Sequence, residues 1–307
     1  MKAVICTKYG PPEVLKIQEV NKPIFKDNEV LVKIISTAVN SGDVRVRGLV
    51  ADGIMKLIMR LMIGFSKPRK AILGTVYAGV IEDVGINVSK FKKGDKVFGM
   101  TAFNFGTHAE YTAVKEKSYI SLMPENASFD EAVSLIFGGQ TAIYFIDKVR
   151  LSEMKSPNVL VIGATGSVGT AAVQIAKFNG AEVTAVCSTK GKDLMEQLGV
   201  SNVIFYDLED FTKQSVQYDF IFDAVGKTDK KQCQALLKEN GIYKTVGGFE
   251  YASESHEQLE KIKNLYEKGR LKAIIDRKFP LDRIVEAHEY VDTGRKKGNV
   301  IINVFES

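Results

Sequence analysis

Cysteine is scarce in this chain of 307 residues, which has three, Cys6, Cys187 and Cys233, at widely separated positions. An odd number of distant cysteines excludes a disulfide framework and is typical of a protein from a reducing compartment. No apolar run is long enough to span a bilayer, and the chain opens directly on a strand-like stretch without a leader-like segment. We therefore expect a cytoplasmic protein.

Charge of one sign is not concentrated either. The 42 lysines and arginines exceed the 37 acidic residues by a net charge of +5. They do not form the clustered basic stripes that suit nucleic acid, apart from one segment near residue 60. The length exceeds that of one typical domain, and 45% hydrophobic residues are enough for a substantial core. The sequence predicts two domains and no nucleic-acid partner, and it favours a protein without membrane contact over one that binds a membrane through a single segment near residue 60.

A strand, a glycine turn and a helix follow one another in the middle of the chain. Residues 159–162 are all apolar and predict a strand buried on both faces. The next residues fit the dinucleotide fingerprint G-x-G-x-x-G with alanine in the first place, in which glycines and a helix N-terminus approach a pyrophosphate. The alternative is a plain tight turn. The predicted cofactor contacts are Ala164, Thr165, Gly166, Ser167, Val168 and Gly169.

The second predicted strand, residues 182–186, indicates which dinucleotide binds. A carboxylate at its end would bind the free ribose 2′-hydroxyl of NAD(H), but the chain has Ser188, Thr189 and Lys190 there. Two hydroxyls and an ammonium suit a 2′-phosphate, so NADP(H) is favoured over NAD(H). Tyr206 follows the third strand and flanks the same end of the cofactor. Alternatively, Lys190 lies on a solvated loop.

The order of elements predicts an α/β fold. The first ~120 residues are rich in short β-branched runs. Beyond Pro124 a helix is expected at 128–136 and a second from 141, and strands then alternate with helices, one of them near 229–239. This alternation predicts βαβ units on a parallel sheet. Strand character returns near the end, so we expect the tail to rejoin the first domain. The predicted boundaries are 1–123 with 271–307, and 124–270.

Several motifs carry a resemblance to a known family over essentially the whole length. They lie at residues 9–15, 38–43, 73–79, 106–111 and 222–226, besides the fingerprint. With them the chain resembles zinc-independent members of the medium-chain dehydrogenase/reductase superfamily, of the quinone oxidoreductase type. The resemblance implies a Rossmann domain inserted in a GroES-like β domain, with NADPH in a cleft between the two.

Zinc alcohol dehydrogenases share this architecture, so the metal ligands need separate consideration. A catalytic zinc needs three ligands of Cys, His or carboxylate type. The zinc relatives place a Cys in the segment that matches residues 40–43 and a His-Glu pair near Thr75 and Val76, and this chain has neither. Its histidines, His108, His256 and His288, are far apart in sequence and in predicted domain. We expect no zinc, and we interpret His108 as a polar loop residue.

Without a metal, the substrate must already be electrophilic, which favours a quinone or an enone. The resemblance makes Asn40 and Asp43 the catalytic candidates, although they alternatively only brace a turn. It also places Thr141 at the nicotinamide. Further cofactor contacts are expected at the carboxyl ends of strands, from Val225, Val246 and Gly247. Two other functions stay open: a reductase or dehydrogenase of another carbonyl or alcohol, and a non-catalytic NADPH-binding regulator.

Two segments depart from the family pattern. Residues 53–65 form a methionine-rich helical stretch with Lys56 and Arg60. It is interpreted as a wall over a cleft for an apolar substrate, as a packing or dimer contact, or as a surface for a membrane. After Gly248 the chain is shorter than its relatives and lacks a sixth strand. We therefore expect a monomer or a homodimer that does not use the usual sheet edge.

Overall fold

The computed structural model describes residues 1–51, 53–248 and 250–305. The chain divides into two compact units, Met1–Ile136 with Ile275–Ser307, and Phe137–Ile274. The second unit is therefore inserted between two segments of the first. The fold is that of a Rossmann-like domain inserted in a GroES-like β domain.

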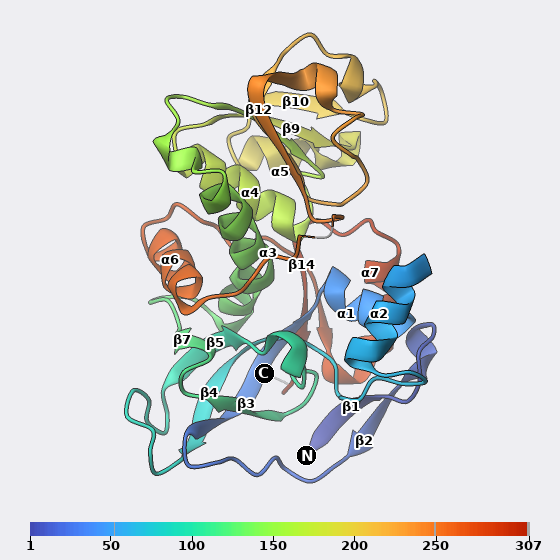
Figure 1. Ribbon diagram of the computed structural model, residues 1–307. Helices are drawn as coiled ribbons and strands as arrows, with labels where there is room; N and C mark the ends of the chain where they lie inside the picture. The colour runs from blue at the N-terminus through green and yellow to red at the C-terminus, as the bar shows by residue number, and fades with distance from the viewer. Residues whose placement is uncertain (52, 249, 306–307) are drawn as a thin grey trace. The chain divides into compact units, whose positions relative to one another are not determined.

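The first unit is built on antiparallel strands. Its larger sheet has the order β13-β14-β3-β4-β5-β7, with β6 also paired to β3, and β1 pairs with β2 separately. The tail rejoins this unit because β14 pairs antiparallel with β3, as Figure 1 shows. The strands are β1 (Lys2–Cys6), β2 (Leu15–Glu19), β3 (Glu29–Val39), β4 (Val76–Val84), β5 (Lys96–Met100), β6 (Tyr111–Lys115), β7 (Tyr119–Leu122), β13 (Ile275–Pro280) and β14 (Asn299–Asn303).

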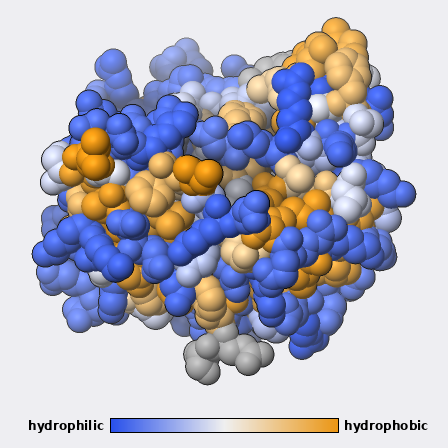
Figure 2. Space-filling model, turned by 90° about the horizontal axis from the view of Figure 1, so that it is seen from below, coloured by the Kyte–Doolittle hydropathy of each residue, from blue (hydrophilic) through white to orange (hydrophobic). Residues whose placement is uncertain are grey.

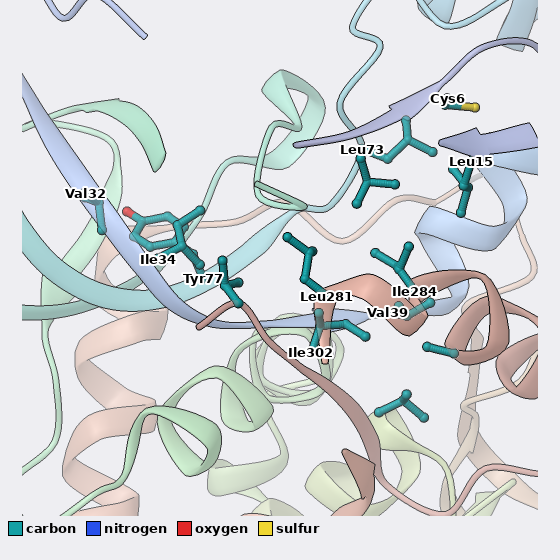
Figure 3. Packing of buried hydrophobic residues seen from close by; sticks show 14 of the residues in the cluster. Cys6, Leu15, Val32, Ile34, Val39, Leu73, Tyr77, Leu281, Ile284 and Ile302 are labelled. Atoms are coloured by element: carbon teal, nitrogen blue, oxygen red, sulfur yellow. The ribbon is translucent and has the colours of Figure 1, made fainter. Parts of the chain in front are cut away.

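The core of this unit lies between the sheet and a C-terminal helix. Its helices are α1 (Ser41–Gly48), α2 (Gly53–Ile63) and α7 (Ile284–Asp292). Alternate residues of β3, such as Val32 and Ile34, are fully buried, as the period of two in a strand requires. They belong to one apolar cluster with Tyr77 of β4 and Ile284 of α7 (Figure 3). This packing fixes the end of β3, where the candidate residues of α1 begin.

The second unit contains a parallel sheet of the order β10-β9-β8-β11-β12 in the part of the chain that the structure describes. Val159–Ile162 of β8 are almost fully buried, which explains their uninterrupted apolar run. The strands are β8 (Asn158–Ile162), β9 (Glu182–Cys187), β10 (Asn202–Phe205), β11 (Tyr218–Asp223) and β12 (Leu237–Thr245), and the helices are α4 (Ser167–Phe178), α5 (Lys192–Gln197) and α6 (His256–Glu267). Helix α3 (Phe129–Lys148) begins in the first unit and continues into the second from Phe137.

Two expected helices are corrected by the structure. The helices expected at 128–136 and from 141 are one continuous helix, α3. Gly138 and Gly139 do not interrupt it; they allow close packing, because a Cβ atom would lie 2.2 Å from the Ser167 carbonyl oxygen at Gly138 and 2.8 Å from Ile262 at Gly139. The α-helix expected near 229–239 is wrong: the segment forms a turn and the short 3₁₀ helix Gln234–Leu236, and Leu237 already pairs with Tyr218 as the first residue of β12.

Hydropathy and helix length together bear on membrane insertion. Among residues 1–51, 53–248 and 250–305, none of the helices combines the length and the apolar character needed to cross a bilayer.

Candidate functional site

The fingerprint turn is shaped by three glycines in the second unit. Gly163 directly follows β8 and has a φ of +75°. It has no room for a Cβ atom, which would lie 2.5 Å from the Val225 side chain. Gly169 lies in the first turn of α4, and a Cβ atom there would lie 2.1 Å from the Gly163 carbonyl oxygen. The sequence analysis assigned the first place of the motif to Ala164, which is fully buried. The left-handed turn belongs to Gly163, which the sequence analysis left out.

Gly166 has a different environment from the other two glycines. It is the N-cap residue of α4, and among the described residues a Cβ atom there would contact only the Gly163 carbonyl oxygen, at 3.7 Å. Ser167 and Val168 then begin the helix and are buried. Packing within the protein therefore does not require a glycine at position 166. The lack of a side chain at this helix N-terminus instead fits the close approach of a pyrophosphate. These residues therefore fit a dinucleotide.

The residues expected at the adenosine end lie beside this turn. A Cβ atom at Gly191 would lie 2.5 Å from the Thr165 side chain, so the short 3₁₀ helix Thr189–Gly191 packs against the fingerprint. The Tyr206 N–H donates to the Cys187 carbonyl at 3.0 Å, which brings the end of β10 to the end of β9. Tyr206 itself is exposed.

A carboxylate that the sequence analysis missed lies at this end. Asp207 accepts hydrogen bonds from the Thr189 N–H at 2.8 Å and from the Thr189 hydroxyl at 2.7 Å. The expectation that no carboxylate lies at the end of β9 is therefore wrong: residues 187–190 contain none, but the fold brings the Asp207 carboxylate there. The sequence pattern did not reveal this carboxylate, because the fingerprint predicts one at the end of the second strand of the unit, and Asp207 follows the third strand, β10.

Helix α3 brings Thr141 to the same region, because the close packing at Gly138 sets α3 against the first residue of α4. The Thr141 hydroxyl donates to the Phe137 carbonyl at 2.8 Å. Beside it, Gln140 is 2% exposed, and its amide has no hydrogen-bond partner among the described residues. Buried amides are normally satisfied, so the Gln140 amide is a buried polar group next to Thr141 in the chain that still has donors and acceptors to use.

Asp223 organises the loops after β11 and β12. Its buried carboxylate accepts from the N–H groups of Val225 at 3.0 Å and Gly226 at 2.9 Å. Gly226 and Gly247 pack backbone against backbone, since a Cβ atom on Gly226 would lie 2.7 Å from the Gly247 Cα atom. The Val246 N–H donates to the Asp223 carbonyl at 3.0 Å. The predicted contacts Val225, Val246 and Gly247 thus lie together at the carboxyl ends of two adjacent strands.

The two catalytic candidates lie in the first unit, at the start of α1. Asn40 is the N-cap residue, and its N–H donates to Asp43 Oδ2 at 2.8 Å. Both side chains are buried, and within the described chain Asn40 Nδ2 and Asp43 Oδ1 have no hydrogen-bond partner. Burial raises the pKa of Asp43 to about 7. The backbone N–H groups of Asn40 and Gly74 lower this pKa, but their effect is smaller than that of burial. Asp43 therefore braces the helix start, and Asn40 keeps a spare amide donor.

His108 lies in the loop before β6, but it is buried, and although the histidines are far apart in sequence, the fold brings two of them together. His108 and His288 form a buried edge-to-face pair with ring centroids 5.7 Å apart. His108 Nε2 lies 3.1 Å from the Ala38 carbonyl oxygen. Burial lowers the pKa of His108 to about 4 and also lowers that of His288. Both imidazoles are therefore neutral at physiological pH.

The donor set does not fit a catalytic zinc. Asn40, Thr75 and Val76 occupy the places where the zinc relatives carry their ligands, and Val76 is fully buried in β4. In the described ranges, no three side chains of His, Cys, Asp or Glu type come together in a way that would hold a metal ion.

Helix α2 exposes an apolar face. Exposed hydrophobic residues recur at helical spacing on one side of it, and Met59 and Ile63 contribute to a small core cluster on the other. Figure 2 shows several groups of hydrophobic side chains on its face, at the left as well as at the right, and α2 lies on the right in Figure 1. The exposed residues of α2 and the following loop are Ile54, Leu57, Ile58, Leu61, Met62 and Phe65.

Two domain families match the chain. Residues 26–125 match the alcohol dehydrogenase GroES-like domain, and residues 167–276 match the zinc-binding dehydrogenase family. The first match covers much of the antiparallel unit, and the second runs from the start of α4 through most of the inserted unit.

Full-length relatives agree with these matches. The 2-methylene-furan-3-one reductase of Solanum lycopersicum is 34% identical over 322 residues, covering 99% of this chain and 79% of that protein. The chloroplastic NADPH-dependent alkenal/one oxidoreductase of Arabidopsis thaliana is 31% identical over 321 residues, covering 98% and 79%. Among solved structures, the quinone oxidoreductase from Coxiella burnetii superposes with a TM-score of 0.87 at 26% identity and covers 99% of both chains.

Proposed function

Because this chain belongs to the medium-chain dehydrogenase/reductase superfamily, in its quinone oxidoreductase group, we propose that it is an NADPH-dependent reductase that transfers hydride to a quinone or an α,β-unsaturated carbonyl. The observation that carries this proposal is the fingerprint turn, in which Gly166 leaves space at the N-terminus of α4. The relatives that match over nearly the whole chain are named as reductases of such compounds.

In this proposal the residues of the protein bind and orient NADPH, and the cofactor provides the group that reacts with the substrate. When bound, NADPH supplies the hydride. The first turn of α4 receives the pyrophosphate, and Ser188, Thr189 and Lys190 receive the 2′-phosphate. Thr141, Val225, Val246 and Gly247 border the nicotinamide half. Asp223 binds Val225 through its carboxylate and Val246 through its carbonyl oxygen. Gly247 packs against Gly226, whose N–H donates to the same carboxylate.

Asn40 is the residue that we assign to the substrate. Its Nδ2 group donates a hydrogen bond to the substrate carbonyl oxygen, where negative charge develops as the β-carbon accepts hydride. Asp43 positions Asn40 through the bond from the Asn40 N–H. Since the donor set does not fit zinc, one amide donor replaces a Lewis acid, which limits the enzyme to substrates that are already electrophilic.

Several finer points are part of the same proposal. The substrate domain comprises about residues 1–123 and 271–307, and the NADP(H)-binding domain about 124–270. The two compact units divide a few residues later, after Ile136 and Ile274, and Gly138 on α3 packs against the first residue of α4 in the second unit. The substrate is a small apolar molecule, and the protein is a monomer or a homodimer that leaves β12 unpaired. A cytoplasmic location is supported by three buried cysteines that form no disulfide among the described residues.

The direct test is NADPH oxidation at 340 nm against a panel of quinones and enones, with NADH and a chelator as parallel controls. Turnover that the chelator leaves unchanged is expected. Gly166→Ala is the matched variant: a Cβ atom has room in the protein, so the free energy of unfolding is expected to fall by only about 1 kcal/mol, from the poorer N-cap, while NADPH affinity falls by roughly tenfold. Tight NADPH binding without turnover of any acceptor would instead favour a regulatory NADPH-binding protein.

A further inference from the structure

The acidic side chain of Asp207 lies among the groups assigned to the cofactor 2′-phosphate. Strands β9 and β10 are parallel neighbours with Cys187 opposite Phe205, so their carboxyl ends share one edge of the sheet. Asp207 follows β10 at this edge and accepts from the Thr189 N–H at 2.8 and 3.1 Å and from its hydroxyl at 2.7 Å. The carboxylate thus already uses two of the donors that a phosphate needs.

The charge of this carboxylate is maintained at neutral pH. The Thr189 hydroxyl, the Thr189 N–H and the nearby Lys190 ammonium lower the pKa of Asp207. An ionised carboxylate repels a 2′-phosphate and competes with it for Thr189 and Lys190. The free 2′-hydroxyl of NADH, in contrast, donates a hydrogen bond to a carboxylate at the end of a strand.

We propose that Asp207 is a cofactor-selectivity residue, which weakens the preference for NADPH and allows this reductase to bind NADH as well. This inference rests on the proposed function and concerns the adenosine end of the same site. Asp207 binds Thr189, the first residue of the short 3₁₀ helix that packs through Gly191 against Thr165 of the fingerprint turn. The enzyme therefore accepts both dinucleotides, with a balance that one side chain sets.

The test compares dissociation constants by isothermal titration for NADPH, NADH, adenosine 2′,5′-bisphosphate and adenosine 5′-monophosphate. Asp207→Asn keeps the shape and removes the charge. We expect the ratio of NADH to NADPH dissociation constants to rise by about tenfold, and the bisphosphate to gain affinity while the monophosphate does not. The change should shrink at high salt, because Asp207 is exposed.

Asp210→Asn is the matched control. Asp210 lies three residues further on, is also ionised, and accepts from the N–H and hydroxyl of Thr212 in the same pattern. An unchanged selectivity ratio in Asp207→Asn, or an equal change in Asp210→Asn, would overturn the role of Asp207. If the unsubstituted chain bound neither dinucleotide, the proposed function itself would fail, and the inference with it.

Discussion

Asp43 shows what burial does to a single side chain. Burial in the folded protein favours the neutral form of the Asp43 carboxyl group and raises its pKa to about 7. In the unfolded chain the Asp43 carboxyl group ionises near pH 4. Between about pH 4 and 7 the folded protein therefore carries a proton on Asp43 that the unfolded chain has lost. The free energy of unfolding that this residue contributes therefore falls as the pH rises through that window.

We expect Asp43→Asn to remove this dependence, because the amide keeps the acceptor for the Asn40 N–H but does not ionise. The stability of the unsubstituted protein relative to the variant should fall by as much as about 4 kcal/mol from pH 4 to 7. Urea unfolding at several pH values measures this difference. The buried His108 and His288 titrate in the opposite sense, but they are present in both proteins and cancel. A difference that does not vary with pH would contradict the argument.

At the residue scale, the sequence identified side chains that a local motif places. Gly166 and Gly169 were predicted because the fingerprint is contiguous. Asp207 was missed because its contact with Thr189 joins the ends of two different strands, which no local spacing reveals. Gly163 was missed because alanine in the first place of the motif obscured which residue makes the turn.

At the scale of elements, the loops after β11 and β12 are held together by contact between two glycines. Gly226 has φ +72°, and a Cβ atom there would lie 2.7 Å from the Gly247 Cα atom. Gly226→Ala is expected to lower the free energy of unfolding by about 2–4 kcal/mol, from backbone strain plus overpacking, and to weaken NADPH binding. Urea unfolding and titration with NADPH measure the two effects.

Gly269→Ala separates the two causes of that loss. Gly269 has a similar φ of +64°, but a Cβ atom there meets nothing within 4 Å among the described residues. This control should therefore lose about 1 kcal/mol from strain alone and bind NADPH normally. Equal losses in the two variants would show that the contact between Gly226 and Gly247 does not matter.

The exposed face of α2 leads to a prediction about substrate choice. If this face contacts an apolar substrate, Leu57→Gln with Leu61→Gln should raise KM for large apolar enones by roughly tenfold and leave small polar enones unchanged. Ile86→Gln is the control, because Ile86 is 86% exposed and lies on a turn outside α2. Steady-state kinetics on both substrate classes decide the point. Similar turnover of both classes by the unsubstituted enzyme would contradict an apolar pocket.

Most elements were predictable because their hydrophobic periods are strong. The strands of the parallel sheet and α4 follow from uninterrupted apolar runs and small residues. The helix expected near 229–239 failed because strand pairing took Leu237, a tertiary effect that overrides helix propensity. The break expected in α3 failed because glycines that weaken an isolated helix are retained here for close packing.

At the scale of the whole molecule, β12 ends the parallel sheet in the described part of the chain. Charged residues such as Lys238 and Glu239 lie along this edge strand, and charges on an edge oppose pairing with another chain. We expect the amide hydrogens of β12 to exchange at the same rate in dilute and concentrated protein. Hydrogen exchange followed by mass spectrometry, with light scattering to give the mass, tests this. Protection of β12 that grows with concentration would show that the edge pairs after all.

The sequence by itself determined the fold class, the inserted dinucleotide-binding unit and the family, because apolar periodicity and contiguous glycine motifs are local properties of the chain. Tertiary structure alone decided which side chains share a site. It set the Asp207 carboxylate against Thr189, buried His108 beside His288, and packed α3 against α4 at Gly138. Each of these contacts joins residues from different elements, and its energy depends on distances that only the packed chain fixes.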